Sequence, residues 1–244
     1  MKKIIFCLFG FTFLTSAAFA QADEEDDNYN SEFAYGINLN TNGGLIGGFM
    51  LKNSRKINGN MYHYFFLEIV NVKHPKEVRY PTYQNSTLTD FKQNFMFVVR
   101  PQYGRELVLF RKAPEQGVQI NAILAAGPSF GLLKPYYIQY NSGQQGQSLS
   151  VSAPYTNQIR NHYRIEGAGS FFDGFDQMSV KLGANLKAAV SFELGTFRNS
   201  VTGFEVGILT EAFTQKMVIM DPATVPGQQF FTSAYINIFF GSRK

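Results

Sequence analysis

The sequence has 244 residues, of which 45% are hydrophobic, 16% aromatic and only 16% charged. A charged fraction below the roughly 25% of ordinary soluble domains argues against a disordered chain. Cys7 is the single cysteine, so the rest of the chain has neither disulfides nor a cysteine metal site. The mean hydropathy of -0.14 excludes a bundle of membrane helices. It permits a membrane β-barrel, in which lipid-facing and interior residues alternate along each strand.

Residues 1–20 have the pattern of a secretory signal peptide. Lys2 and Lys3 precede an apolar run, and Ala18 and Ala20 form an A-x-A cleavage site. Without the two lysines the basic count falls from 22 to 20 against 18 acidic residues, and the net charge falls from +4 to +2. A chain with this balance has no electrostatic basis for binding nucleic acid.

The segment 21–32 is acidic and poor in apolar side chains, which predicts a disordered tail. From Phe33 the chain changes to a period of two, so residues 33–244 are expected to form one β-domain. No run of 18 or more apolar residues follows the signal peptide, and this excludes a membrane helix on length.

Alternating side chains predict eight strands. One of them alternates without a break from Val180 to Glu193, whereas soluble strands average five or six residues and a bilayer needs about nine to eleven. In chain order the eight predicted strands cover about residues 32–40, 45–51, 61–72, 94–103, 118–132, 179–193, 201–213 and 234–240.

The connections between these strands alternate in length. Links on one side would be the TNGG turn and residues 74–91, 134–178 and 215–229, and links on the other side would be residues 52–60, 104–117 and 194–200. Long loops outside, with shorter turns and both termini in the periplasm, are typical of outer-membrane barrels.

The last strand contains INIFF, with an aromatic end and apolar residues at alternate positions. Together with the signal peptide and the strand pattern, this ending makes the chain resemble the small eight-stranded outer-membrane β-barrels of the OmpA/OmpX-like type found in Bacteroidetes. The resemblance covers roughly residues 33–240. It implies an antiparallel up-and-down transmembrane barrel in the outer membrane of a Gram-negative bacterium, with lipid around it. Such barrels include adhesins, envelope structural proteins, lipid A enzymes and accessory subunits, so the fold alone selects no activity.

An eight-stranded barrel has an interior that side chains fill, which argues against a general diffusion porin. Charges buried there must pair or be hydrogen-bonded. The pattern therefore predicts an ion-pair network inside the barrel, with a proton or ion pathway as the alternative. Its members would be Glu68, Arg100, Lys181, Lys187, Glu193, Glu205 and Glu211.

Aromatic residues are frequent in residues 74–91 and 134–178, which are the second and third of the links predicted to lie outside and are called outward links here. Large aromatics on a surface are typical of protein contact sites, so we expect these links to dock other outer-membrane or surface proteins. The candidates are Tyr80, Tyr83, Phe91, Tyr136, Tyr137, Tyr140, Tyr155, Tyr163, Phe171, Phe172 and Phe175.

No catalytic, metal or cofactor site is predicted. The three histidines are His63, His74 and His162, and no spacing links them to a nucleophile or a carboxylate. The DGFD motif at residues 173–176 is interpreted as a turn rather than a calcium loop. We therefore expect a non-enzymatic accessory subunit of an envelope complex for outer-membrane protein assembly or secretion. The alternatives are a stand-alone adhesin or envelope-stabilising barrel, and a hydrolase of lipid A or peptides at the barrel rim.

Overall fold

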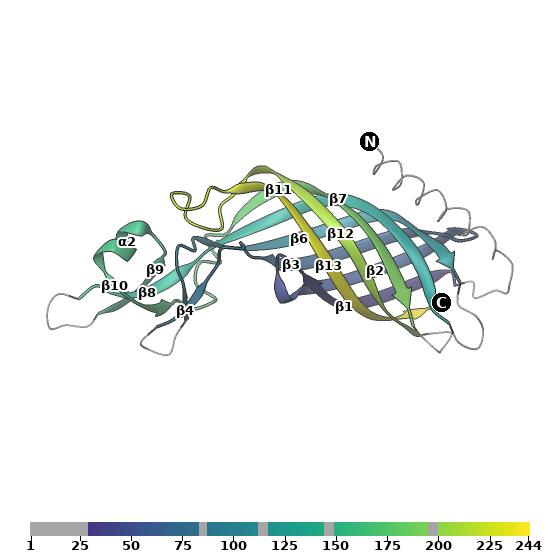
Figure 1. Cartoon of the computed structure of the whole chain (residues 1–244), viewed down its shortest axis with the longest axis horizontal. Coiled ribbons are helices and arrows are strands. Elements are labelled where there is room, and N and C mark those ends of the chain that lie inside the picture. Colours follow the sequence, from purple (N-terminus) through teal and green to yellow (C-terminus); the bar gives the residue numbers. More distant parts are fainter. Residues whose placement is uncertain (1–28, 83–86, 112–116, 144–148, 195–199) are drawn as a thin grey trace, which may run out of the picture.

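The structure, a computed structural model, describes residues 29–82, 87–111, 117–143, 149–194 and 200–244. Eight strands form a closed barrel in the order β1-β13-β12-β11-β7-β6-β3-β2, and every neighbouring pair is antiparallel (Figure 1). The predicted all-β class and eight-stranded ring are confirmed. The strands are β1 (Ser31–Asn40), β2 (Gly44–Asn58), β3 (Met61–Val72), β6 (Asn94–Phe110), β7 (Gln119–Pro135), β11 (Ser179–Glu193), β12 (Ser200–Met217) and β13 (Gln228–Arg243).

The strands are staggered around the ring. Following the paired residues once around the barrel from Ser31 leads to Thr41, ten residues further along the chain. Eight strands with this stagger tilt by about 40° from the barrel axis. We call the end at which β1 begins and β13 ends the turn end, and the opposite end the loop end.

Three strands are longer at the turn end than the sequence predicted, and one of them is β13, which continues to Arg243. β2 continues to Asn58 and β6 to Phe110, so the links expected at residues 52–60 and 104–117 are mostly strand. The cause is that Lys52 and Glu106 point into the barrel, where polar side chains pair with one another. Polar residues are also common in turns, so the sequence alone does not distinguish these strand segments from turns.

The expected tail also ends earlier than residue 32. Tyr29 is buried and stacks on Tyr62 with ring centroids 4.6 Å apart, while Ser31 and Glu32 already belong to β1. The predicted signal peptide and the rest of the tail, residues 1–28, lie outside the described residues.

The outer wall of the barrel is apolar. Exposed side chains include Leu124 at 60% and Ile208 at 58% of their full accessibility, on strands whose alternate residues are buried. A contiguous apolar surface of this kind is unfavourable in water, and a closed ring leaves no unpaired strand edge in hydrocarbon. The wall is that of a membrane-embedded barrel.

None of the described helices is long and apolar enough to span a bilayer.

Ion pairs fill the interior in layers. Near the turn end, Lys52 Nζ lies 2.8 Å from both Glu32 Oε1 and Glu106 Oε1. Arg243 joins the same layer by pairing with Glu32 and Glu193. Because every one of these side chains is buried or nearly so, each charge depends on its neighbours for the interactions that water would supply.

Three further ion pairs, made by two basic residues, lie above this layer. Lys187 Nζ is 2.7 Å from Glu205 Oε1, which also accepts a hydrogen bond from Tyr235. Closer to the loop end, Arg100 Nη2 lies 2.7 Å from Glu211 Oε1, and its Nη1 lies 3.3 Å from Glu68 Oε2.

The structure places six of the seven predicted network residues inside the barrel. Lys181 differs, because it is only half-buried and donates to Gln215 at 2.6 Å in an exposed setting. Four members were not predicted, because three of them lie beyond the predicted turn-end bounds of their strands and Glu32 was counted in the acidic tail. They are Glu32, Lys52, Glu106 and Arg243.

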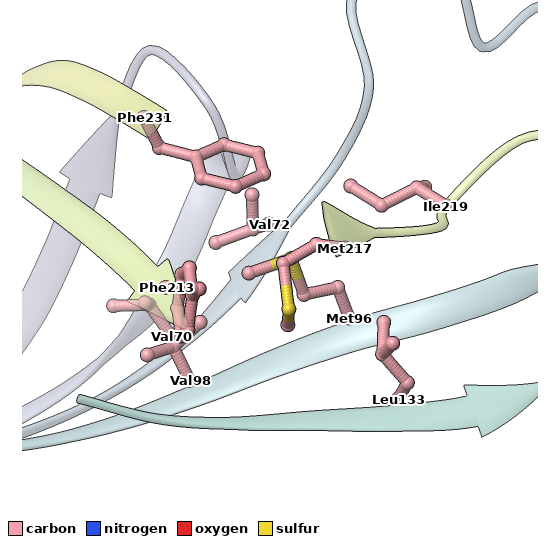
Figure 2. Close-up of a cluster of buried hydrophobic side chains, with 9 residues drawn as sticks. All are labelled: Val70, Val72, Met96, Val98, Leu133, Phe213, Met217, Ile219 and Phe231. Carbon is pink, nitrogen blue, oxygen red and sulfur yellow. The ribbon is translucent and has the colours of Figure 1, made fainter. Parts of the chain in front are cut away.

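An apolar cluster closes the interior at the loop end. Figure 2 shows side chains of β3, β6 and β12 gathered together, with Met96 beside Met217. Its members are Val70, Val72, Met96, Val98, Leu133, Phe213, Met217, Ile219 and Phe231.

Replacing Lys187 by Met should destabilise the barrel by about 3 to 5 kcal/mol, because Glu205 is left as a buried carboxylate without a cation. Urea unfolding of the barrel refolded in lipid vesicles measures the change. The double variant Lys187→Met/Glu205→Gln should recover much of the loss, and the control Lys181→Met should change little. Equal effects at Lys181 and Lys187 would contradict the paired interior.

Replacing Ile208 by Arg should cost about 2 to 4 kcal/mol in a bilayer, because Ile208 lies on the outer wall away from both strand ends. The matched control is Thr202→Arg, which also points outward from β12 but lies near the turn end, where the penalty is about 0 to 1 kcal/mol. Vesicle refolding yields and urea unfolding measure both. An arginine tolerated equally at the two positions would show that water bathes the wall.

Candidate functional site

The outward links fold into a small lobe beyond the loop end (Figure 1). The sequence predicts long loops in these outward links. The structure shows a three-stranded sheet in the order β10-β8-β9, a two-stranded sheet of β4 and β5, and one short helix. Their bounds are β4 (Arg79–Pro81), β5 (Thr87–Thr89), β8 (Tyr137–Asn141), β9 (Ser150–Pro154), α2 (Asn157–His162) and β10 (Arg164–Ala168).

The lobe has a hydrophobic core of its own. Tyr136, Ile138 and Tyr155 are buried together, and Leu88 of β5 and Ile159 of α2 pack against them. The backbone N–H of Thr89 donates to Tyr136 Oη at 3.1 Å, which links the second outward link to the third. Short apolar segments from separate links therefore complete one core that none of them could bury alone.

An ion pair fastens the helix to the second link. Arg160 donates to both carboxylate oxygens of Asp90, at 2.9 and 3.0 Å, and its guanidinium lies 4.1 Å from the ring centroid of Phe91. Tyr155 Oη donates to the same carboxylate at 3.4 Å. Burial and the Asp90 charge raise the pKa of Tyr155 to about 12, so its hydroxyl keeps its proton at neutral pH.

Phe91 lies in the left-handed region with φ 57°, the only described non-glycine residue with a positive φ. The backbone N–H of Phe91 donates to Asp90 Oδ1 at 3.0 Å, and its carbonyl accepts from Asp221 at 2.7 Å. A strained bulky residue of this kind persists where its surroundings hold it in place.

The link between β12 and β13 completes the lobe. The backbone N–H of Gln93 donates to the carbonyl of Ile219 at 2.9 Å, and Asn157 Nδ2 donates to Asp221 Oδ2 at 2.6 Å. Three outward links are thus connected by backbone and side-chain bonds. The lobe is one structured body rather than a set of independent loops.

A buried lysine supports the base of the lobe. Lys92 Nζ lies 2.6 Å from Glu77 Oε2 and 4.3 Å from the ring centroid of Phe95. Burial lowers the pKa of Lys92, and the Glu77 carboxylate opposes that shift. His74 is also buried, which lowers its pKa, and its Nδ1 accepts a hydrogen bond from the backbone of Lys76.

Aromatic rings gather where the lobe meets the barrel wall. We call Phe95, Phe97, Phe171, Phe172 and Phe175 the rim cluster. Within it, Phe171 makes edge-on contacts with Phe95 and Phe97 at centroid distances of 6.2 and 6.4 Å, and Phe172 is 78% exposed.

The turn that carries these rings is tightly built. Lys134 Nζ donates to the backbone carbonyls of Phe171 and Asp173 at 2.6 and 2.9 Å. Gly174 has φ +81°, and a side chain there would meet the ring of Tyr137 at 2.6 Å. The DGFD motif is therefore a turn that only glycine suits at its second position.

The predicted docking residues fall into separate environments. Tyr136 and Tyr155 belong to the lobe core, Tyr137 packs against Gly174, and Phe91 lies beneath Arg160. Phe171, Phe172 and Phe175 form part of the rim cluster. The lobe surface retains Tyr80 at 53% and Tyr163 at 45% exposure, and the ring of Tyr140 contacts that of Tyr163 at a tilt, with centroids 5.0 Å apart. Tyr83 lies outside the described residues.

The histidines lie far apart in the fold. His63 is on the outer wall of β3, His74 is at the base of the lobe, and His162 ends α2 with its Nδ1 beside the carbonyl of Gln158. Asp90 is engaged by Arg160, and Asp173 by Ser152 and Ser170. Within the described ranges, no group of three or more His, Cys, Asp or Glu side chains could hold a metal ion.

No protein-family model matches this chain, and no curated protein sequence matches it. Solved structures are similar to it. Neisserial surface protein A, from Neisseria, has a TM-score of 0.41 and 6% identity over 88% of this chain and 96% of its own. Ail, the attachment invasion locus protein of Yersinia pestis, has a TM-score of 0.37 and 12% identity over 89% of this chain and 99% of its own. Ail in complex with the heparin analogue sucrose octasulfate also has a TM-score of 0.37, with 11% identity over 88% and 97%. The similarity is one of fold alone.

Proposed function

We propose that the protein is a non-enzymatic outer-membrane barrel that holds a rigid lobe at the cell surface, where the lobe docks another protein. The turn end and both termini would face the periplasm. The observation that carries this proposal is the lobe itself, because two links share one core and an ion pair, and hydrogen bonds fasten a third link to them. A filled interior under an apolar cluster supports a role in display rather than transport.

The lobe surface and the rim cluster have different roles in this proposal. Phe171, Phe172 and Phe175 lie beside the barrel wall, where aromatic rings favour the boundary between lipid and water. Tyr140 and Tyr163 lie on the three-stranded sheet and its flank, away from the wall strands. We assign the rim cluster to membrane contact, and the Tyr140/Tyr163 pair with Tyr80 to the partner.

Two settings fit a docking lobe. In the first, the barrel is an accessory subunit of an envelope complex for assembly or secretion. In the second, it stands alone as an adhesin or an envelope-stabilising barrel. The apolar outer wall of the described strands favours this second setting, because such a wall needs only lipid around it. Gentle detergent extraction from native membranes separates the two, since a stoichiometric companion supports the first setting and a lone barrel supports the second.

The double variant Tyr140→Ser/Tyr163→Ser should lose partner binding while keeping the barrel folded, because large aromatics dominate protein contacts and each truncation commonly costs 2 kcal/mol or more. Binding is measured as the companion retained on the purified barrel or, for a lone barrel, as attachment of cells or matrix to barrel-bearing vesicles. Phe172→Ser is the matched control and should bind normally. Loss of binding only in the Phe172 variant would move the docking surface to the rim cluster.

Breaking the Arg160–Asp90 pair should loosen the lobe without unfolding the barrel. The pair is partly exposed, so Arg160→Gln should cost about 1 kcal/mol locally and raise the protease cleavage rate near α2 several-fold. The double variant Arg160→Gln/Asp90→Asn should be little worse than either single variant. Heat-dependent gel mobility reports the intact barrel. Unchanged cleavage would show that the lobe is held by its core alone.

A further inference from the structure

A row of basic side chains crosses the outer wall near the turn end. Arg55 of β2 pairs in register with His63 of β3, and His63 pairs in register with Arg105 of β6. All three point away from the interior, on three adjacent strands of the ring. We call Arg55, His63 and Arg105 the basic row.

The basic row has no carboxylate partner on this wall. The acidic residues of the same strands, Glu68 and Glu106, point inward and are paired there. Arg105 Nη1 donates instead to His63 Nδ1 at 2.8 Å, and the hydroxyl of Tyr103 lies 2.8 Å from the same nitrogen.

Arg55 is the most available member of the row. It is exposed and makes no hydrogen bond or ion pair with another residue in the described ranges. Two guanidinium groups thus flank His63 from the strands on either side of β3, with donor capacity that the described residues leave unused.

Apolar side chains surround the basic row. Phe65 and Tyr103 are exposed on its loop-end side, and Met61 and Leu107 on its turn-end side. Basic groups in a lipid-facing wall are unfavourable unless they meet an anion or the polar boundary of the bilayer.

The height of the basic row matches that boundary. Phe95 of the rim cluster and Arg105 are ten residues apart on β6. A rise of about 3.4 Å per residue at a tilt of about 40° separates them by about 25 Å along the barrel axis. This is the height of the apolar band of outer-membrane barrels. The rim cluster and the basic row therefore mark opposite boundaries of the hydrocarbon.

We propose that the basic row binds the phosphate of an anionic glycerophospholipid in the leaflet at the turn end. Guanidinium groups match phosphate oxygens with paired hydrogen bonds, and Phe65 and Tyr103 offer the adjoining acyl chain an aromatic surface. The inference rests on the proposed function only in taking the barrel to span a membrane, and it is independent of any protein partner.

The test uses the full mature chain, purified in detergent and titrated with phosphatidylglycerol or phosphatidylcholine in native mass spectrometry. The wild-type barrel should bind phosphatidylglycerol preferentially. Arg55→Gln/Arg105→Gln should weaken that binding about tenfold or more, the loss expected for even one charge-assisted contact. Arg55→Lys/Arg105→Lys should retain part of it, because charge remains while the paired geometry is lost.

The matched control is Arg79→Gln/Lys216→Gln, which removes the same two charges from exposed positions outside the basic row and should bind like the wild type. Gel mobility before and after heating confirms that every variant is folded. Equal binding of the two lipids, or equal losses in the control and the test variant, would overturn the proposal. Displacement of the lipid by inorganic phosphate at the same concentration would also overturn it, because the site would then recognise free phosphate. Partner binding by the lobe is scored separately, so the two proposals can fail independently.

Discussion

Backbone hydrogen bonding in a medium without water is the constraint on which this structure depends. A sheet edge exposed to hydrocarbon would leave a row of unpaired N–H and C=O groups, so only a ring without edges is stable there. The pairing of β1 with β13 closes that ring. Closure fixes the stagger, the stagger fixes the tilt, and the tilt sets how far apart along the axis two residues of one strand lie.

The same closure creates an interior too narrow for bulk water. Charged side chains that point inward must find partners across the barrel, and they do so between strands far apart in the sequence, such as Lys52 with Glu106 and Arg100 with Glu211. These pairs hold the strands in register, because a shift of one residue would exchange each inward charge for an outward apolar side chain. The apolar cluster at the loop end then separates this polar interior from the lobe.

Much of the barrel can be predicted from local sequence. The segment from Ser179 to Glu193 alternates cleanly because one face meets lipid and the other meets the interior, and the structure gives the strand the same bounds. The turn-end portions of β2 and β6 were missed because Lys52 and Glu106 are polar, and polarity by itself does not distinguish a filled interior from a turn.

The local sequence pattern did not predict the lobe, for a different reason. Its strands are short, and β8 begins at Tyr137, directly after the end of the wall strand β7 at Pro135. Its core joins Leu88 to Tyr155 and Ile159, and its fastening joins Asp90 to Arg160, so both depend on contacts between separate links. The aromatic content of these links was visible in the sequence. The sequence did not reveal which of these rings are buried. Their burial depends on contacts with a partner segment some 50 to 70 residues away in the chain.

The bonds that join the start of β1 to residues 243 and 244 have a consequence for closure of the barrel. The backbone of Lys244 bonds with that of Ser31 in both directions, and Arg243 supplies a cation to Glu32 and Glu193. The turn end of the seam between β1 and β13 therefore closes only when residues 243 and 244 have reached β1. A polypeptide that lacks residues 243 and 244 would keep Lys52 beside Glu32 and Glu193 but would lose Arg243 from both carboxylates, so the turn end of the seam would be less firmly closed.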